Sequence, residues 1–236
     1  MNARFVTRVL GAGVVVAGGL LGGVAAPPAS AEPCPDVQVV FARETGAPPG
    51  VGGLGQAFVD ALRSQVGAKS VDVYPVNYAA SNNFGDRTAL AESVVDGIRD
   101  AANHIESTAN ACPSTKMVLG GYSQGAALAG YVTSAAVPKE VSAAFESGVP
   151  TPMPASVADH VAAVVLFGTP SNAWLSAYGA PPITIGPRYE SKTLKLCNPG
   201  DTICDGTAGG GPSLEHTLYA ANGAVNQGAN FAASHL

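Results

Sequence analysis

The sequence predicts an α/β fold in which helices cover both faces of a mostly parallel, five-stranded sheet. Short apolar runs typical of buried strands alternate along the chain with segments whose apolar residues recur at helical spacing. A Gly-x-Ser-x-Gly pattern at 121–125 stands between one such run and an Ala-rich segment, as a sharp turn between a strand and a helix would. These observations predict a three-layer sandwich with a site at the carboxyl ends of its strands.

Five apolar segments are expected to form the sheet. Each is short, and the segment 161–167 is apolar throughout, which is typical of a strand in the middle of a parallel sheet. The predicted strands are residues 37–41, 71–76, 117–120, 161–167 and 193–196.

Helices are expected between these strands. Residues 54–66 carry apolar side chains at helical spacing, and Asp86 is suited to cap a long amphipathic helix over 86–104. Another helix follows the serine turn at 126–136. A last helix is expected over about 213–222, with further helix towards the C-terminus left open.

Three other segments are expected to be loops. Residues 42–55 are rich in Gly and Pro, and residues 179–187 are interpreted as an exposed loop. The Pro-containing segment 138–154 is either a loop inserted near the site or a surface connection, and the second interpretation is favoured.

The first 31 residues are predicted to be a secretory signal peptide. Arg4 and Arg8 precede the apolar run 9–26, and the small residues 29–31 supply a cleavage site. A membrane anchor is disfavoured because the run is rich in Gly and leads directly into two prolines and that site. No later segment is long and apolar enough to span a bilayer. Residues 32–236 are therefore expected to form a single domain.

The charge of the chain argues against nucleic acid as a partner. The formal net charge is −5 at pH 7, and the predicted cleavage removes two arginines and makes the mature chain more acidic. Phosphate binding needs clustered Lys and Arg, and the sequence has no such cluster.

The four cysteines point to disulfides rather than to a metal. An even number in an exported chain suggests two bridges, for which three pairings exist. Cys197 and Cys204 would close a short loop, and Cys34 could join the first strand to Cys112. No C-x-x-C spacing is present, so a zinc site is not expected, and no cofactor is predicted.

Ser123, at the apex of the 121–125 pattern, is the candidate nucleophile. Glycines flank such a turn because a side chain would strike the neighbouring strand or helix, as in the nucleophile elbow of α/β-hydrolases. A helix starting behind the serine offers free N–H groups and the positive end of its dipole.

A serine hydroxyl needs a base, and the base needs an orienting acid; in α/β-hydrolases the acid and then the histidine follow the serine. His216 is preferred as the base, because His160 precedes any good acid and His235 stands at the chain end. Asp201 is preferred as the acid, because the loop between Cys197 and Cys204 could hold it rigidly. The other acid candidates are Asp159, Glu190, Asp205 and Glu215, and Asp205 suits a turn better.

Several motifs together resemble the cutinase family, and in particular the cutinase-like proteins of actinobacteria. The resemblance covers most of the chain after residue 31, and the Cys-flanked acid motif is its most specific part. It rests on Gly120-Gly121-Tyr122-Ser123-Gln124-Gly125-Ala126, on Cys197-Asn198-Pro199-Gly200-Asp201-Thr202-Ile203-Cys204 followed by His216, and on Phe41-Ala42-Arg43, Val76-Asn77-Tyr78-Ala79-Ala80-Ser81 and Leu166-Phe167-Gly168-Thr169-Pro170.

The resemblance implies a cutinase-like α/β-hydrolase with a defined set of site residues. Ser123 would be the nucleophile, Asp201 the acid and His216 the base, with bridges Cys34–Cys112 and Cys197–Cys204. Backbone N–H groups of Thr45 and Gln124 would form the oxyanion hole. Family members commonly carry Gly where this chain has Glu44, a larger charged residue beside that loop.

The function expected is a secreted serine esterase acting through an acyl-enzyme on short- to medium-chain esters, lipids or polyesters. Its partners would be an ester or lipid substrate, without nucleic acid or stable membrane insertion, and it would be a monomer; attachment to the cell wall is left open. Trp174 and Tyr178 are candidates to line an acyl groove, and Tyr122 is either a substrate contact or a packed aromatic. An acyltransferase using the same residues and a non-catalytic binding protein on this scaffold are the alternatives.

Overall fold

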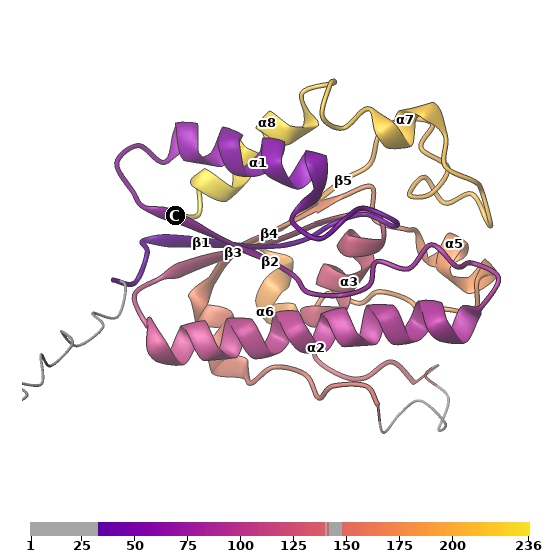
Figure 1. Ribbon diagram of the computed structural model, residues 1–236, viewed down its shortest axis with the longest axis horizontal. Coiled ribbons are helices and arrows are strands. Elements are labelled where there is room, and N and C mark those ends of the chain that lie inside the picture. Colours follow the sequence, from indigo (N-terminus) through magenta and orange to yellow (C-terminus); the bar gives the residue numbers. More distant parts are fainter. Residues whose placement is uncertain (1–32, 140, 142–147) are drawn as a thin grey trace, which may run out of the picture. The chain divides into compact units, whose positions relative to one another are not determined.

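The computed structural model describes residues 33–139, 141 and 148–236, in which five strands form one sheet (Figure 1). The strand order is β2-β1-β3-β4-β5, and every neighbouring pair is parallel. The predicted α/β class and five-stranded sheet are confirmed. The strands are β1 (Val37–Ala42), β2 (Val71–Pro75), β3 (Lys116–Tyr122), β4 (Val161–Phe167) and β5 (Thr193–Leu196).

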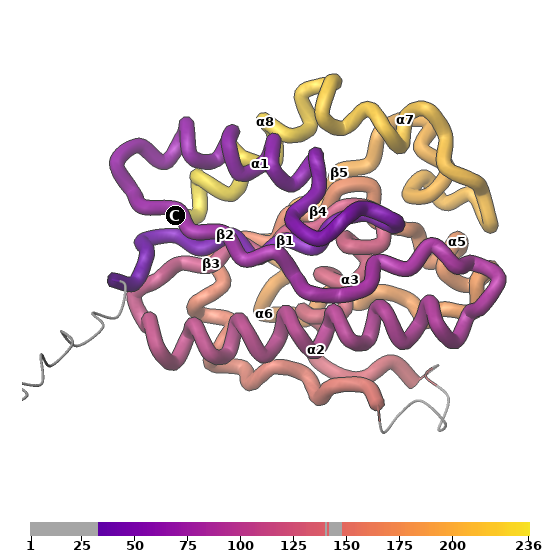
Figure 2. The backbone as a smooth tube through the Cα atoms, in the orientation of Figure 1, coloured from indigo at the N-terminus to yellow at the C-terminus, as the bar shows by residue number. Residues whose placement is uncertain are grey.

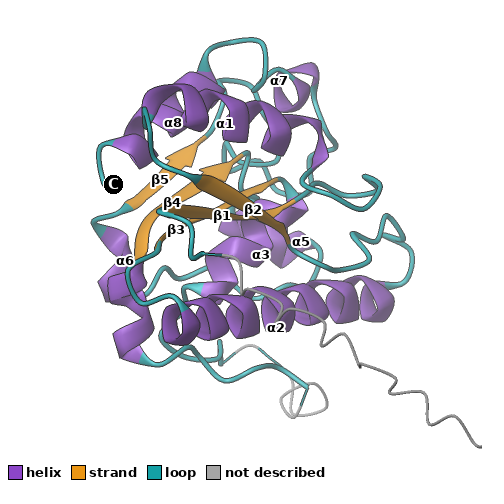
Figure 3. Ribbon diagram, turned by 60° about the vertical axis from the view of Figure 1, so that its left-hand side comes forward, coloured by secondary structure: helices purple, strands orange, loops and turns teal. Residues whose placement is uncertain are grey.

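Helices cover both faces of the sheet (Figures 1 and 3). On one face α1 lies beside α8, although the two are far apart in the sequence (Figure 2). On the other face lie α2 and α3, which also contact each other. The helical segments are α1 (Gly52–Gln65), α2 (Arg87–Ala111), α3 (Gln124–Val132), the 3₁₀ helix η1 (Ala155–His160), α5 (Asn172–Ala177), α6 (Pro187–Glu190), α7 (Leu214–Thr217) and α8 (Ala224–Ala233).

Two apolar cores result from the alternation of side chains along the central strands. In β1, Val39 and Phe41 point to the α1 and α8 face, where Phe58 and Phe167 are fully buried. Val40, between them, points to the opposite core with α2 and α3. Because both faces of the sheet are covered, the central strand β4 is apolar throughout, as the sequence indicated.

The start of α2 agrees with its predicted cap. The Asp86 side chain accepts a hydrogen bond of 3.0 Å from the backbone N–H of Ala89, which satisfies one of the free donors of the first turn. The helix continues to Ala111, beyond the predicted end at residue 104.

The predicted extent of the last helix, about 213–222, is wrong. It begins near Ser213 as expected, but α7 ends at Thr217 after a single turn, and α8 starts only at Ala224. The chain turns between them because Tyr219 is fully buried beneath the site and the Asn222 side chain bonds to Asn198. Gly223, with φ of +90°, then leads into α8 in a backbone conformation that favours glycine.

The interpretation of 179–187 as an exposed loop is also wrong in part. Ile183 is buried in a small apolar cluster with Ala127 and Leu175. The helices α5 and α6, which flank this segment, were not expected from the sequence; they are too short to produce a periodic signal.

Two disulfides tie the described chain together. Cys34 is bonded to Cys112, and Cys197 to Cys204. The first joins the segment before β1 to the end of α2, and the second closes a loop directly after β5.

The predicted signal peptide, residues 1–31, lies outside the described residues. Among the helices that the structure describes, none has both the length and the apolar character needed to cross a membrane.

Candidate active site

Ser123 stands at a sharp turn between β3 and α3. Its backbone has φ of +56° and ψ of −117°, which is strained for a residue with a side chain. Its N–H donates to the carbonyl of Phe167 at 2.9 Å, which fixes the turn to the end of β4. Such strain persists only where the surrounding structure enforces it, and here a strand, a helix and a cross-strand hydrogen bond do so.

The two glycines around Ser123 allow close backbone packing. A Cβ on Gly121 would collide with the backbone carbonyl of Gly125 in α3. A Cβ on Gly125 would collide with the carbonyl of Ala42 at the end of β1. The expectation that side chains here would strike the neighbouring helix and strand is therefore confirmed.

His216 lies between Ser123 and Asp201. Its Nε2 is 2.9 Å from the Ser123 Oγ, and its Nδ1 is 2.9 and 2.8 Å from the two carboxylate oxygens of Asp201. The Asp201 side chain is fully buried and that of His216 nearly so. A proton on Nδ1, donated to Asp201, leaves Nε2 free to accept the serine proton.

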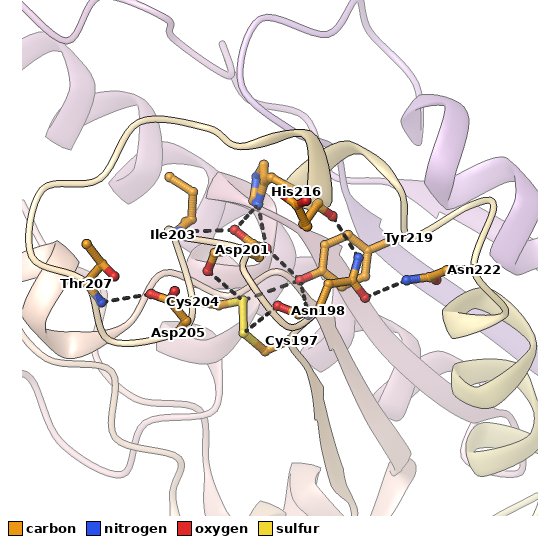
Figure 4. Close-up of a disulfide and its surroundings, with 11 residues drawn as sticks. Cys197, Asn198, Asp201, Ile203, Cys204, Asp205, Thr207, His216, Tyr219 and Asn222 are labelled. Atoms are coloured by element: carbon orange, nitrogen blue, oxygen red, sulfur yellow. Dashed lines mark hydrogen bonds and ion pairs between the residues drawn. A yellow bond between two sulfur atoms is a disulfide. The ribbon is translucent and has the colours of Figure 1, made fainter.

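Two further donors hold the Asp201 carboxylate (Figure 4). The Tyr219 hydroxyl donates to Oδ2 at 2.6 Å, and the Ile203 N–H donates to Oδ1 at 3.0 Å. Burial, followed by the hydrogen bond to Asp201, raises the pKa of Tyr219 well above its usual value, so this hydroxyl keeps its proton. Sequence reasoning missed Tyr219, since nothing in its local pattern marks it as a partner of the acid.

The loop around Asp201 is fixed by a disulfide and by polar side chains (Figure 4). The bridge between Cys197 and Cys204 spans the acid. The Asn198 side chain donates to the carbonyl of Glu215 at 2.7 Å and accepts from Asn222 at 2.7 Å. These bonds connect the segment of Asp201 to α7, which carries His216, and to the turn that follows α7.

The rival candidates lie elsewhere. Asp205 accepts a hydrogen bond of 2.8 Å from the Thr207 N–H, and this bond lowers the pKa of its exposed carboxyl, as suits a turn residue. His160 ends η1, and the ring of His235 bonds to the carbonyl of Phe231 in α8. The structure thus brings together the preferred serine, acid and histidine, and none of these three alternatives.

The loop after β1 reaches the site and is held by a buried arginine. The Arg43 guanidinium donates to the carbonyls of Ala47 and Tyr78 at 2.8 and 2.6 Å and lies over the Tyr78 ring. In return the Tyr78 hydroxyl donates to the Arg43 carbonyl. The motifs at 41–43 and 76–81 are therefore two halves of one network, a pairing that their sequence separation conceals.

Thr45 and Gln124 line the same cavity as Ser123. Gln124 is the first residue of α3, so its backbone N–H has no acceptor within the helix. Its side chain donates to the Ser81 carbonyl at 3.0 Å, which ties the start of the helix to the Arg43 network. Both residues thus belong to the wall of the cavity into which Ser123 opens.

Glu44 is accommodated by a glycine. Its carboxylate lies against Gly52, where a Cβ would come within 2.5 Å of the Glu44 Oε2. This oxygen is buried and has no hydrogen-bond partner among the described residues. Its negative charge is one of the causes, after burial, that raise the pKa of Tyr122 to about 12. The Tyr122 hydroxyl donates to the His216 carbonyl, so this aromatic packs under the base.

The site opens into a cavity of about 850 Å³ that is mostly apolar. Trp174 and Tyr178, whose rings stack with centroids 4.2 Å apart, lie in its wall. Described residues of 138–154, among them Pro138 and Met153, line it too. The preferred interpretation of that segment as only a surface connection is therefore wrong. Its apolar residues form part of the wall of the cavity beside Ser123.

Within the described ranges, no three His, Cys, Asp or Glu side chains gather as a metal-binding group. The chemistry that this arrangement can perform is that of a hydroxyl nucleophile activated by a histidine. A parallel sheet, a strained serine turn and a buried Ser-His-Asp arrangement define a serine hydrolase of the α/β-hydrolase class.

Comparisons with known proteins specify the family. The family model described as Cutinase matches residues 33–236, so the chain belongs to the cutinase family. It is 60% identical over 173 residues to "Probable carboxylesterase Culp7" of Mycobacterium tuberculosis, covering 73% of this chain and 89% of that protein. It is 44% identical over 242 residues to "Carboxylesterase Culp1" of Mycobacterium bovis, covering 100% and 98%. The protein is thus a cutinase-family carboxylesterase.

A solved structure agrees with this assignment. Trichoderma reesei cutinase in complex with a phosphonate inhibitor is 33% identical and superposes with a TM-score of 0.60, covering 86% of this chain and 77% of that one. The family expected from the sequence motifs is therefore confirmed.

Proposed function

We propose that this protein is a secreted esterase that hydrolyses carboxylic esters through an acyl-enzyme on Ser123. The observation that carries the proposal is the continuous set of contacts from Ser123 through His216 to the buried Asp201, at the mouth of an apolar cavity. The two carboxylesterase relatives support the reaction class.

The first half of the reaction forms the acyl-enzyme. The Ser123 Oγ attacks the ester carbonyl carbon while His216 Nε2 takes the hydroxyl proton, and the positive imidazole is stabilised by Asp201. The negative oxygen that develops is bound by the N–H groups of Gln124 and Thr45, each such donor contributing about 3 kcal/mol in comparable sites. The C–O bond to the alcohol then breaks, and His216 returns the proton to the departing alkoxide.

The second half releases the acid. A water molecule gives its proton to His216 and attacks the acyl carbonyl, and the proton passes back to the Ser123 Oγ as the bond to the acyl group breaks. Asp201 stays ionised throughout and keeps the imidazole in the tautomer that both halves need. Tyr219 and the Ile203 N–H support this role, because they fix the carboxylate without supplying a charge.

The substrates proposed are uncharged esters with apolar acyl groups, such as lipid or polyester esters of short to medium chain length. The mostly apolar wall of the cavity supports this choice, because it gains free energy by covering hydrocarbon. Export is supported by the predicted signal peptide and by the two disulfides, which persist in oxidising compartments.

Hydrolysis of p-nitrophenyl butanoate tests the proposal. Ser123→Ala should lower kcat by about 10⁶-fold, to near the uncatalysed rate. Asp201→Asn should lower it by about 10⁴-fold, because the amide favours the wrong tautomer of His216. Asp205→Asn is the matched control in the same loop, and its turnover should equal that of the wild type. Turnover by Ser123→Ala within tenfold of the wild type would refute the assignment.

A further inference from the structure

Helix α2 has two faces turned inward, one fully buried and one only partly buried. The small residues Ser93, Gly97 and Ala101 are buried and allow close approach. At Gly97 a Cβ would collide with Leu128 of α3, so this face is closed against the neighbouring helix. Leu90, Val94 and Ile98 lie on an adjacent face of the helix and are only partly buried.

That adjacent face carries an apolar stripe along the cavity. Leu90, Val94, Ile98 and Ala102 follow one another at intervals of four residues and all line the cavity that contains Ser123. The first three are only partly buried, although they lie on the inner side of the helix. Val94 and Ile98 pack in part against the core between α2 and the sheet, and their remaining apolar surface faces the cavity.

The stripe lines one part of the cavity together with residues of α3 and of the segment before η1. We call the part of the cavity lined by Leu90, Val94, Ile98, Ala102, Tyr131 and Met153 the α2 channel. Tyr131 belongs to α3, and its hydroxyl is turned to the Pro181 carbonyl at 2.5 Å, so its ring rather than its polar group is available to the channel. With a rise of 1.5 Å per residue, the distance from Leu90 to Ala102 is about 18 Å.

The channel lies on the acyl side of the serine. In the proposed reaction His216 gives its proton to the departing alcohol, so the alcohol part of the ester must lie towards His216. His216 belongs to α7, which lies with α1 and α8 towards one face of the sheet, whereas α2 covers the other (Figure 1). The group that stays on Ser123 therefore extends towards α2 and α3.

From these observations we propose that the α2 channel binds the acyl chain of a long-chain ester, extended along α2 from Ser123 towards Ala102 and Met153. The proposal rests on the esterase function above and revises its chain length. A length of about 18 Å corresponds to an extended acyl chain of about 14 carbons. The occupant is linear and uncharged, because Leu, Val, Ile and Ala side chains offer no polar partner.

A chain-length series on the full-length secreted protein tests this first. Rates for p-nitrophenyl esters from butanoate to hexadecanoate, kept below the concentrations at which they aggregate, should show kcat/KM rising to about 12 to 14 carbons. If butanoate is hydrolysed but kcat/KM falls steadily beyond about eight carbons, the channel proposal is overturned while the esterase function stands. If even butanoate is not hydrolysed, the esterase proposal fails first.

Blocking variants then locate the chain. Val94→Phe and Ile98→Phe each fill the channel, one turn of α2 apart, so the chain length at which kcat/KM drops should be shorter for Val94→Phe by about four carbons. The ratio of kcat/KM for hexadecanoate to that for butanoate should fall at least about tenfold in both. Asn103→Phe places the same ring on the exposed side of α2 and should leave the ratio at its wild-type value.

The ordered shift is the decisive readout. A general loosening of the fold would lower the rates for all esters alike and would give both variants the same profile. If Val94→Phe and Ile98→Phe, both folded by circular dichroism, keep the wild-type ratio, the acyl chain does not lie along α2. If one variant fails to fold, the kcat/KM ratio of the other variant and the chain-length series of the wild type still test whether the acyl chain lies along α2.

Discussion

The serine turn and the loop that carries the acid and the histidine reach the same site but are held in different ways. Ser123 is fixed by regular structure: the end of β3, the start of α3 and a backbone bond to β4. The segment 197–219 contains only the single turn of α7, and a disulfide and side-chain hydrogen bonds hold Asp201 and His216. The serine position thus depends on close backbone packing, and the acid position depends on polar partners.

This difference predicts how each region fails. The serine turn should tolerate no added atom, because its neighbours are main-chain groups that cannot move aside. The acid loop should tolerate conservative changes with graded losses, because each removes one of several supports.

The largest effect is expected from Gly125→Ala. Its new methyl group would meet the Ala42 carbonyl, and relieving that collision must separate α3 from β1. We expect a loss of about 4 kcal/mol or more in the free energy of unfolding, measured by urea denaturation. Gly53→Ala is the matched control, since a Cβ there meets nothing within 4 Å and the helix should gain about 0.5 to 1 kcal/mol. Equal midpoints for Gly125→Ala and the wild type would contradict the rigid-turn picture.

Removal of the Cys197–Cys204 bridge should have a smaller effect on stability and a specific effect on activity. The closed loop is short, so the double change to Ala should cost about 2 to 3 kcal/mol. Looser placement of Asp201 should lower kcat by about ten- to a hundredfold at temperatures where the variant is fully folded.

The Cys34–Cys112 bridge provides the contrast. It closes a loop of sequence separation 78, so its removal should cost more stability, about 4 kcal/mol. It lies away from the site, and the folded variant should keep its activity. The comparison of the two regions would be wrong if the Cys34–Cys112 variant lost more activity than the Cys197–Cys204 variant when both are folded.

The two regions also differ in how far the sequence predicted them. The serine turn could be predicted because its signals are contiguous: an apolar strand, two glycines and a helix-forming segment. Asp201 and His216 could be chosen by chain order and by resemblance to a family. Tyr219 could not, because its bond to Asp201 joins residues 18 apart through a turn where a continuous helix was expected.

Contacts between distant segments also explain the other features that the sequence did not predict. Arg43 and Tyr78 are 35 residues apart, so their network is visible only once β1 and β2 pair. The segment 138–154 carries no periodic pattern, and its role depends on the apolar face of α2 that it helps to cover. Local patterns therefore predicted the elements, whereas contacts between distant segments decided the walls of the site.

The smallest effect is expected from Tyr219→Phe, which removes one support of the acid and leaves the rest. At pH 7 the lost hydrogen bond to Asp201 should cost about 1 to 2 kcal/mol in the free energy of unfolding and lower kcat modestly. Because folding raises the pKa of Tyr219, its contribution is complete below the unfolded pKa of 10.0 and declines as the pH rises above it. Above pH 10 the unfolding free energy of Tyr219→Phe should therefore fall less steeply than that of the wild type, by about 1.4 kcal/mol per pH unit.

Tyr189→Phe is the control: burial raises the pKa of Tyr189 to about 12, so this variant should show a similar change of slope between pH 10 and 12 with wild-type kcat. Parallel curves for Tyr219→Phe and the wild type above pH 10 would show that the Tyr219 proton is not held by the folded acid loop.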